Sequence, residues 1–125
     1  MRRPRFEFVI DCSDPWALVS FWETALTYTR HPDATGEPYL GLLPPDDEPG
    51  PVVVLQRVPE PKVVKNRAHL DLYVKDPESL IERLITTGGS RLGGPQTYEG
   101  QWFQVMQDPE GNEFCILKEW VQEFL

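Results

Sequence analysis

Two copies of one pattern, 62 residues apart, constrain the fold of this chain more than any other feature of its sequence. An alternating segment at residues 5–12 leads into an Asp-Pro pair that begins at Asp14, and a second alternating segment at residues 69–74 leads into an Asp-Pro pair that begins at Asp76. Asp before Pro is typical of a helix start, because the carboxylate accepts a free backbone N–H and proline suits the first helical position. The repeat therefore predicts two copies of one unit, each with a strand and a capped helix.

Each copy continues with a helical stripe and then with short strands. Apolar residues recur every three or four positions after each Asp-Pro pair, as on the buried face of a helix. The turn-forming residues at 108–112 predict that the last two strands form a hairpin. The strands expected from apolar or β-branched segments are residues 39–43, 52–58, 101–107 and 113–118.

The pattern as a whole predicts an α+β fold with one helix packed on one face of each sheet. The other sheet faces are then left to curve around a shared cleft, a common place for binding sites. A length of 125 residues is typical of one domain, so we expect a single domain at 1–125. Its first module covers about 5–58, its second module about 67–118, and a tail follows at 119–125.

Net charge narrows the range of partners. Twenty acidic side chains against twelve Lys and Arg give a formal charge of −8, which repels phosphate backbones and anionic lipid head groups. We therefore expect neither nucleic acid nor a membrane as partner. The apolar run after the arginines at 2–5 is interrupted at Glu7 and Asp11, and no segment reaches the roughly 18 apolar residues of a membrane span. Cys12 and Cys115 form no metal-like pair, and free thiols fit a cytoplasmic protein.

Several motifs follow the strand and the Asp-Pro helix in a fixed order. They are the Phe-Trp pair at 21–22, the segment Asn-Arg-Ala-His-Leu-Asp-Leu at 66–72 and the turn Asp-Pro-Glu-Gly-Asn-Glu-Phe at 108–114. Together they resemble the vicinal oxygen chelate superfamily, which contains glyoxalase I, bleomycin-resistance proteins and extradiol dioxygenases. The chain is most similar to the compact glyoxalase-like domains of bacteria, over nearly its whole length. The resemblance implies two βαβββ modules with curved mixed sheets, and a homodimer.

The resemblance also implies one divalent metal ion, held by side chains from the first and last strands of each module. Seven residues before the two helix caps, the first strands present Glu7 and His69, and the last strand of the first module offers Gln56. Cys115 stands where a glutamate is usual in this family. His, Glu and Gln suit a zinc, nickel, manganese or iron ion and leave positions open for substrate oxygens. A thiol must ionise to bind well and favours zinc or softer metals.

Four further residues are candidates for binding the substrate. Arg67 and Asp71 alternate with His69 along the expected strand and are placed to orient a ligand. Tyr73 and Trp102 are placed to line the cleft. Each of the four also fits a structural role, as a surface ion pair for Arg67, a carboxylate paired with arginine for Asp71, and core packing for the aromatic residues.

The candidate metal ligands have structural alternatives as well. His69 also fits a hydrogen-bonded histidine of the sheet, and Glu7 and Gln56 also fit solvated residues of strand ends. Cys115 also fits a small buried apolar residue, because no base or positive charge nearby in sequence lowers its pKa. Cys12 falls on the opposite side of its strand from Glu7 and is expected in the core.

Three functional hypotheses stay open at this point, of which the third is a regulatory or accessory domain without a ligand of its own. The first is a metal-assisted lyase, isomerase or dioxygenase that acts on a small oxygenated molecule, in which the metal polarises oxygens and stabilises an anion. The second is a metal-free, drug-sequestering protein of the bleomycin-resistance type that traps an aromatic or cationic molecule, for which a charge of −8 and aromatic residues such as Tyr73 are suited. His31 lies in a loop without evident partners and is assigned no role.

Overall fold

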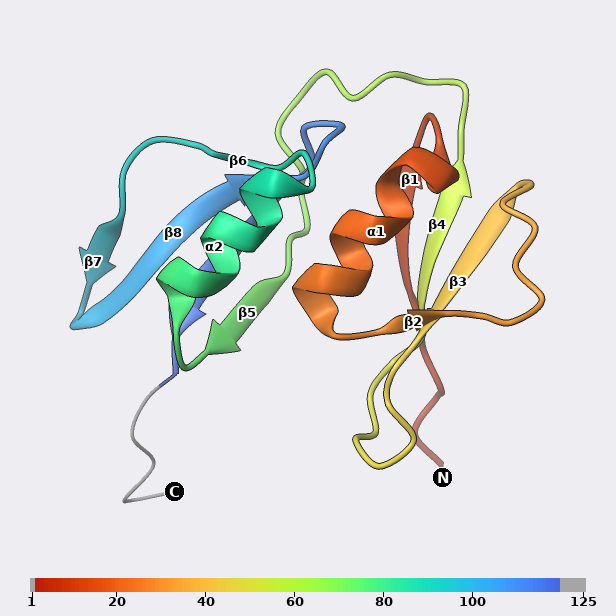
Figure 1. The fold of residues 1–125 in the computed structure, drawn as a ribbon, viewed down its shortest axis with the longest axis horizontal. Coiled ribbons are helices and arrows are strands. Elements are labelled where there is room, and N and C mark those ends of the chain that lie inside the picture. Colours follow the sequence, from red (N-terminus) through yellow and green to blue (C-terminus); the bar gives the residue numbers. More distant parts are fainter. Residues whose placement is uncertain (1, 120–125) are drawn as a thin grey trace. The chain divides into compact units, whose positions relative to one another are not determined.

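The computed structural model describes residues 2–119, and the chain divides into two compact units, residues 1–63 and 64–125. The boundary falls in the connection expected between the modules, at 58–67. Each unit contains one helix and one sheet (Figure 1), so the fold is α+β, as the sequence predicts. Of the predicted tail, residues 120–125 lie outside the described residues.

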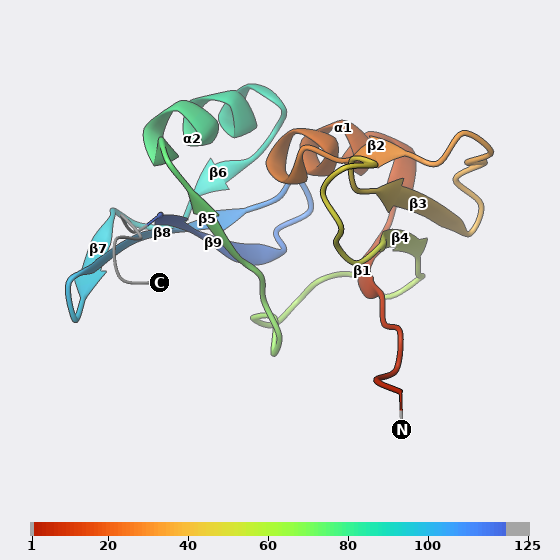
Figure 2. The same cartoon turned by 90° about the horizontal axis from the view of Figure 1, so that it is seen from below.

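The first unit contains β1 (Phe8–Cys12), α1 (Pro15–Leu26), β2 (Thr29–Arg30), β3 (Tyr39–Leu43) and β4 (Val53–Arg57). Its sheet has the order β1-β4-β3-β2, with β1 parallel to β4 and the other neighbours antiparallel. Figure 2 shows α1 on one face of this sheet. The predicted order of strand, helix and three strands is confirmed, although the two-residue β2 lies in a segment that the sequence marks only as polar.

α1 begins and ends close to the predicted positions. Asp14 Oδ1 accepts a hydrogen bond from Trp16 N–H at 3.1 Å, and Pro15 opens the helix. The helix ends at Leu26, because Thr27 adopts a left-handed conformation with φ of 56°. Burial of each large apolar side chain between this helix and the sheet contributes roughly 1.5–3 kcal/mol. The buried residues are Leu18, Val19, Phe21, Trp22, Ala25, Leu40, Leu42, Val53 and Leu55.

The second unit contains β5 (Asp71–Val74), α2 (Pro77–Thr86), β6 (Ser90–Arg91), β7 (Gln96–Tyr98), β8 (Gln101–Gln107) and β9 (Glu113–Lys118). The sheet has the order β5-β9-β8-β6, β7 also pairs with β8, and β5 is parallel to β9. The predicted hairpin is present between β8 and β9. In its turn, the buried Asp108 carboxylate accepts hydrogen bonds from the backbone N–H groups of Glu110 and Asn112. The sequence pattern predicts a strand that starts at His69, but β5 starts at Asp71. His69 therefore lies two residues before the strand.

Side chains alternate between the two faces of each sheet. We call the face opposite the unit's own helix the helix-free face. In the first sheet the paired residues Val9 and Val54 lie on this face, and in the second sheet the paired residues Asp71 and Cys115 do. Cys12 is buried on the helix side, as expected. In the part of the chain that is described, neither helix has the length and apolar character needed to cross a membrane.

Candidate functional site

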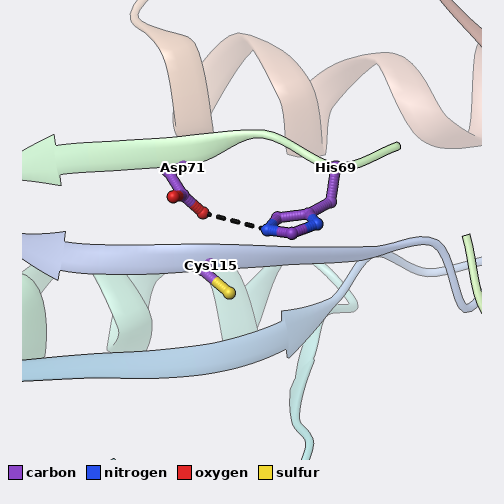
Figure 3. A group of neighbouring side chains, drawn as sticks. All are labelled: His69, Asp71 and Cys115. Carbon is purple, nitrogen blue, oxygen red and sulfur yellow. Dashed lines mark ion pairs between the residues drawn. The ribbon is translucent and has the colours of Figure 1, made fainter. Parts of the chain in front are cut away.

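Three metal-donor side chains converge on the helix-free face of the second sheet (Figure 3). Asp71 and Cys115 are directly paired between the parallel strands β5 and β9, and His69 precedes Asp71 by two residues. His69 Nε2 lies 3.2 Å from Asp71 Oδ1, and the donor atoms of all three side chains lie within 4.8 Å of one another. The side chains of His69 and Asp71 are each 43% exposed, so the group is accessible to an ion from solvent.

Hydrogen bonds fix the segment before β5 against β9. Cys115 N–H donates to the Leu70 carbonyl at 2.9 Å, which extends the parallel pairing beyond the start of β5. Asn66 N–H donates to Glu113 Oε1 at 2.8 Å, and Asn66 Nδ2 donates to the Glu113 carbonyl at 3.3 Å. His69 therefore lies between two anchored residues, Asn66 and Leu70, which restricts where its imidazole can lie.

The charge environment of the group favours a neutral thiol. Burial raises the pKa of the Cys115 thiol, and the negative charge of Asp71 raises this pKa further, while Lys65 acts in the opposite direction. A cation among these side chains would offset the effect of Asp71 and favour the thiolate. The Asp71 carboxylate thus disfavours ionisation of Cys115 in the metal-free protein. With a metal ion present, the same carboxylate would be an anionic donor beside the Cys115 thiolate.

The donor atoms fit a borderline or soft divalent ion. One imidazole nitrogen, one carboxylate oxygen and one thiol sulfur are the atom types that bind zinc, and three protein ligands with an open position are typical of catalytic zinc sites. Magnesium and calcium prefer ligand sets made only of oxygen. Among residues 2–119, no other three His, Cys, Asp or Glu side chains come together in this way.

Glu7 and Gln56, the ligands predicted from the first module, share the helix-free face of the first sheet without being neighbours. Gln56 is paired with Asp11, which lies four positions further along the strand direction than Glu7. Four residues of strand correspond to about 13 Å. The structure therefore brings His69 together with Asp71 and Cys115, but it does not bring Glu7 together with Gln56. Their part in metal binding stays a prediction.

The candidate substrate-binding residues lie in different surroundings. Arg67 is exposed in the segment before β5, and its side chain makes no ion pair within residues 2–119. Tyr73 is 57% exposed on the helix-free face of the second sheet. Trp102 lies on the opposite face, because its neighbour Phe103 occupies the helix-free face and strand residues alternate. Phe103, rather than Trp102, shares a face with Tyr73.

A pocket of about 510 Å³ lies on the helix-free face of the first sheet. The loop after β2 forms part of its rim, because His31 N–H donates to the Gly41 carbonyl of β3 at 2.8 Å. Sequence analysis assigned no role to His31, and no local motif marks it, since its position depends on the pairing of β2 with β3. The lining of the pocket includes Glu7, His31 and Asp33 at the rim and Val9, Tyr39 and Val54 on the sheet.

Solved structures with the same fold cover almost the whole chain. A glyoxalase/bleomycin resistance protein/dioxygenase family enzyme from Burkholderia phytofirmans matches with a TM-score of 0.73 and 19% identity, over 91% of this chain and 97% of that one. The fosfomycin resistance protein FosX from Mesorhizobium loti matches with a TM-score of 0.71 and 14% identity, over 98% of both chains. Comparison with curated proteins gave no match.

The repeated units and these structural neighbours define the fold as that of the vicinal oxygen chelate superfamily, as the sequence motifs predict. More specifically, the chain belongs to the family of the glyoxalase-like domain, whose model matches residues 7–117. The family is thus established over both units, whereas the ligand and the reaction depend on the individual side chains of the site.

Proposed function

We propose that the protein binds a small oxygenated molecule with the help of one divalent metal ion, as a metal-assisted lyase, isomerase or dioxygenase. The observation that carries this proposal is the convergence of His69, Asp71 and Cys115 within 4.8 Å on one sheet face. The fold that the chain shares with a fosfomycin resistance protein supports a small molecule as the ligand.

The chain's own residues would divide the work in the following way. His69 Nε2, one oxygen of Asp71 and the sulfur of Cys115 hold the ion, and the exposed side of the group leaves room for ligand oxygens. A bound divalent ion supplies Lewis acidity towards those oxygens. Arg67, free of ion pairs within the described residues, orients an anionic part of the ligand. Glu7 and Gln56 stay as predicted additional ligands from the first module.

The test is metal analysis of the purified, untagged protein before and after incubation with zinc, nickel, manganese and ferrous ions. We expect about one ion per chain, with zinc preferred because of the thiol. The variant His69→Ala should lose the ion, and His31→Ala is the matched control because these are the two histidines of the chain. Absence of bound ion under every condition, or equal binding by the His69→Ala variant, contradicts the metal proposal.

The second candidate function is metal-free binding of a small molecule, as in drug-sequestering proteins of the bleomycin-resistance type. The pocket of about 510 Å³ in the first unit favours it, because none of His69, Asp71 and Cys115 lines that pocket. Ligand affinity that survives exhaustive chelation would support this function, whereas strict dependence on metal would exclude it.

We also propose that the protein is a homodimer in the cytoplasm. Short strands leave backbone groups at sheet edges that a second copy can pair with, and the free thiols fit a reducing compartment. Sedimentation equilibrium of the purified protein measures the first point, and a single species at the monomer mass of 14.4 kDa would contradict it.

A further inference from the structure

We infer that Glu113 is a positioning residue for the proposed metal site. Its buried carboxylate holds the segment that carries His69, and through that segment it raises the affinity for the ion without binding the ion itself. The inference rests on the proposed metal-assisted function and adds to it a residue outside the donor group. All the residues that it needs belong to the second unit, residues 64–125.

Glu113 is one of three polar or charged residues that are buried in the described part of the chain. A buried carboxylate is costly unless hydrogen bonds compensate for the water that it loses. Glu113 Oε1 accepts a hydrogen bond from the backbone N–H of Asn66 at 2.8 Å, across 47 residues of sequence. The pairing of β9 with β8 at Gln107 needs only the backbone of Glu113. The acidic side chain is thus available to hold the segment before β5.

The segment that Glu113 holds has no regular secondary structure of its own. Residues 65–70 precede β5, and the side chain of His69 is exposed. The downstream end of the segment is fixed at Leu70, whose carbonyl accepts a hydrogen bond from β9. The upstream end is fixed at Asn66, only two residues before the one at 68 that precedes His69. Without the contact with Glu113, an ion would have to order this segment as it binds, which would lower its affinity.

The geometry separates Glu113 from the donor atoms of the site. His69, Asp71 and Cys115 have donor atoms within 4.8 Å of one another, and Glu113 does not belong to this group. Glu113 precedes Cys115 by two residues on β9, which corresponds to about 7 Å along the strand. To hold Asn66, its side chain has to accept a hydrogen bond, and an amide oxygen in the same place can accept the same bond.

The experiment measures the zinc affinity of the full chain by competition with a chelator of known affinity. Glu113→Ala removes the acceptor and should weaken zinc binding at least about tenfold, the lower end of the range for residues that only support ligands. Glu113→Gln keeps an acceptor oxygen and should stay within about threefold of the parent protein. An equal loss in both variants would mean that the charge of Glu113 acts on the ion directly, and it would overturn the positioning role.

Asn66→Ala is a milder second variant, which tests the same contact from the other side. It removes only the bond from Asn66 Nδ2 to the Glu113 carbonyl, at 3.3 Å, and leaves the buried carboxylate in place. It should weaken zinc binding by about threefold. Circular dichroism checks that each variant is folded.

Asp108 provides the matched control within the same hairpin. It is 3% exposed, against 9% for Glu113, and its carboxylate also accepts backbone N–H groups, from Glu110 and Asn112. Asp108→Ala should lower the free energy of unfolding in urea but keep the zinc affinity of the parent protein. A loss of zinc affinity as large as that of the Glu113→Ala variant would mean that any loosening of the hairpin weakens the site, and it would overturn the inference.

A double-mutant cycle tests whether Glu113 acts through His69. In the His69→Ala background, Glu113→Ala should change zinc affinity by less than about twofold, because the ligand that Glu113 positions is already absent. A further loss of about tenfold in this background would overturn the inference. Zinc binding that Glu113→Ala and Asn66→Ala leave unchanged overturns only the positioning role, whereas absence of zinc binding by the parent protein overturns the metal proposal as well.

Discussion

The two units share one backbone plan and differ at the same pair of positions on the helix-free face. In the first sheet, Val9 of β1 pairs with Val54 of β4, and in the second sheet Asp71 of β5 pairs with Cys115 of β9. Both pairs join parallel strands, and position 71 follows position 9 by the 62-residue repeat. Two aliphatic side chains form part of a pocket, whereas a carboxylate and a thiol form a donor group. A duplicated fold can therefore hold two different chemistries without any change of topology.

The residues that precede these pairs follow the same division. Glu7 and His69 occupy equivalent places in the repeat. His69 lies beside Asp71 and contributes a third donor, whereas Glu7 lies at the rim of an apolar pocket and contributes a charge. Two side chains at equivalent positions of the repeat can thus have different roles. The neighbouring residues in the sheet determine the role, and the repeat position alone does not.

Replacing Cys115 with Val makes the second unit resemble the first and should have the largest effect. The change removes one of the three proposed ligands. The loss of zinc affinity should exceed about 100-fold, because removal of residues that only support the ligands already costs about 10- to 100-fold. The fold should be retained, because Val54 occupies the equivalent position in the first sheet. Competition with a chelator of known affinity measures the change.

Cys12 provides the control for this variant. It is the other cysteine of the chain, is 3% exposed and lies on the helix side of its sheet. Cys12→Ala should keep the zinc affinity while it lowers stability, through loss of packing and of the Sγ bond to the Gln56 carbonyl. If both cysteine variants bind zinc like the parent protein, Cys115 is not a zinc ligand, and the proposed difference in metal binding between the two sheet faces is wrong.

Much of the fold is encoded locally, and this is why it could be predicted. Asp14 and Asp76 each cap a helix that begins at the following proline, and β3, β8 and β9 have the predicted bounds. The strands β2 and β6 have two residues each and no buried side chain, so they carry no apolar pattern. They form because a partner strand is present, which is a property of the tertiary structure rather than of the local sequence.

The candidate site could be predicted only in part, because it depends on register. His69 and Cys115 were found through the family motifs, but the direct pairing of Asp71 with Cys115 requires the alignment of β5 with β9. The same limit affects Gln56, which was chosen as the polar residue of its strand. The register instead places Val54 at the position equivalent to Cys115. A helix and at least two further strands separate the members of each pair along the chain, so sequence spacing does not determine their alignment.

A second prediction compares two glycines with similar backbone conformation, one in each unit. Gly36 has φ of 74° and Gly100 has φ of 80°, a region that is unfavourable for residues with a Cβ atom. A Cβ at Gly36 would overlap the Trp16 indole ring, whereas nothing lies within 4 Å of a Cβ at Gly100. Gly100→Ala should therefore cost about 1 kcal/mol from backbone strain alone.

Gly36→Ala should cost about 2 kcal/mol, because the strain is joined by loss of the hydrogen bond from Trp16 to Thr35. Urea unfolding of the two variants measures both values. Equal destabilisation by both variants would mean that the contact with Trp16 adds nothing to stability.

The smallest expected effect is a difference in how pH acts on the two units. In the first unit, Glu23 accepts hydrogen bonds from the Arg30 side chain, which lowers the pKa of Glu23. A lowered pKa stabilises the fold above the unfolded value, near 4.3, and this stabilisation is lost as the pH falls through the folded value. In the second unit, the raised pKa of Cys115 has the opposite sign, so its stabilisation is present below about pH 8.5 and is lost as the pH rises.

The two ends of the stability curve should therefore report on different units. Because Arg30 is 39% exposed, Glu23→Gln should cost no more than about 0.5–1 kcal/mol at pH 7, and it should reduce the loss of stability below pH 5. Cys115→Val should leave the acid side unchanged and reduce the loss above about pH 8.5. Unfolding by urea at pH 4, 7 and 9.5, with a chelator present, measures both slopes. An effect of the Glu23→Gln variant on the alkaline side, or of the Cys115→Val variant on the acid side, would show that the two ionisations are not independent.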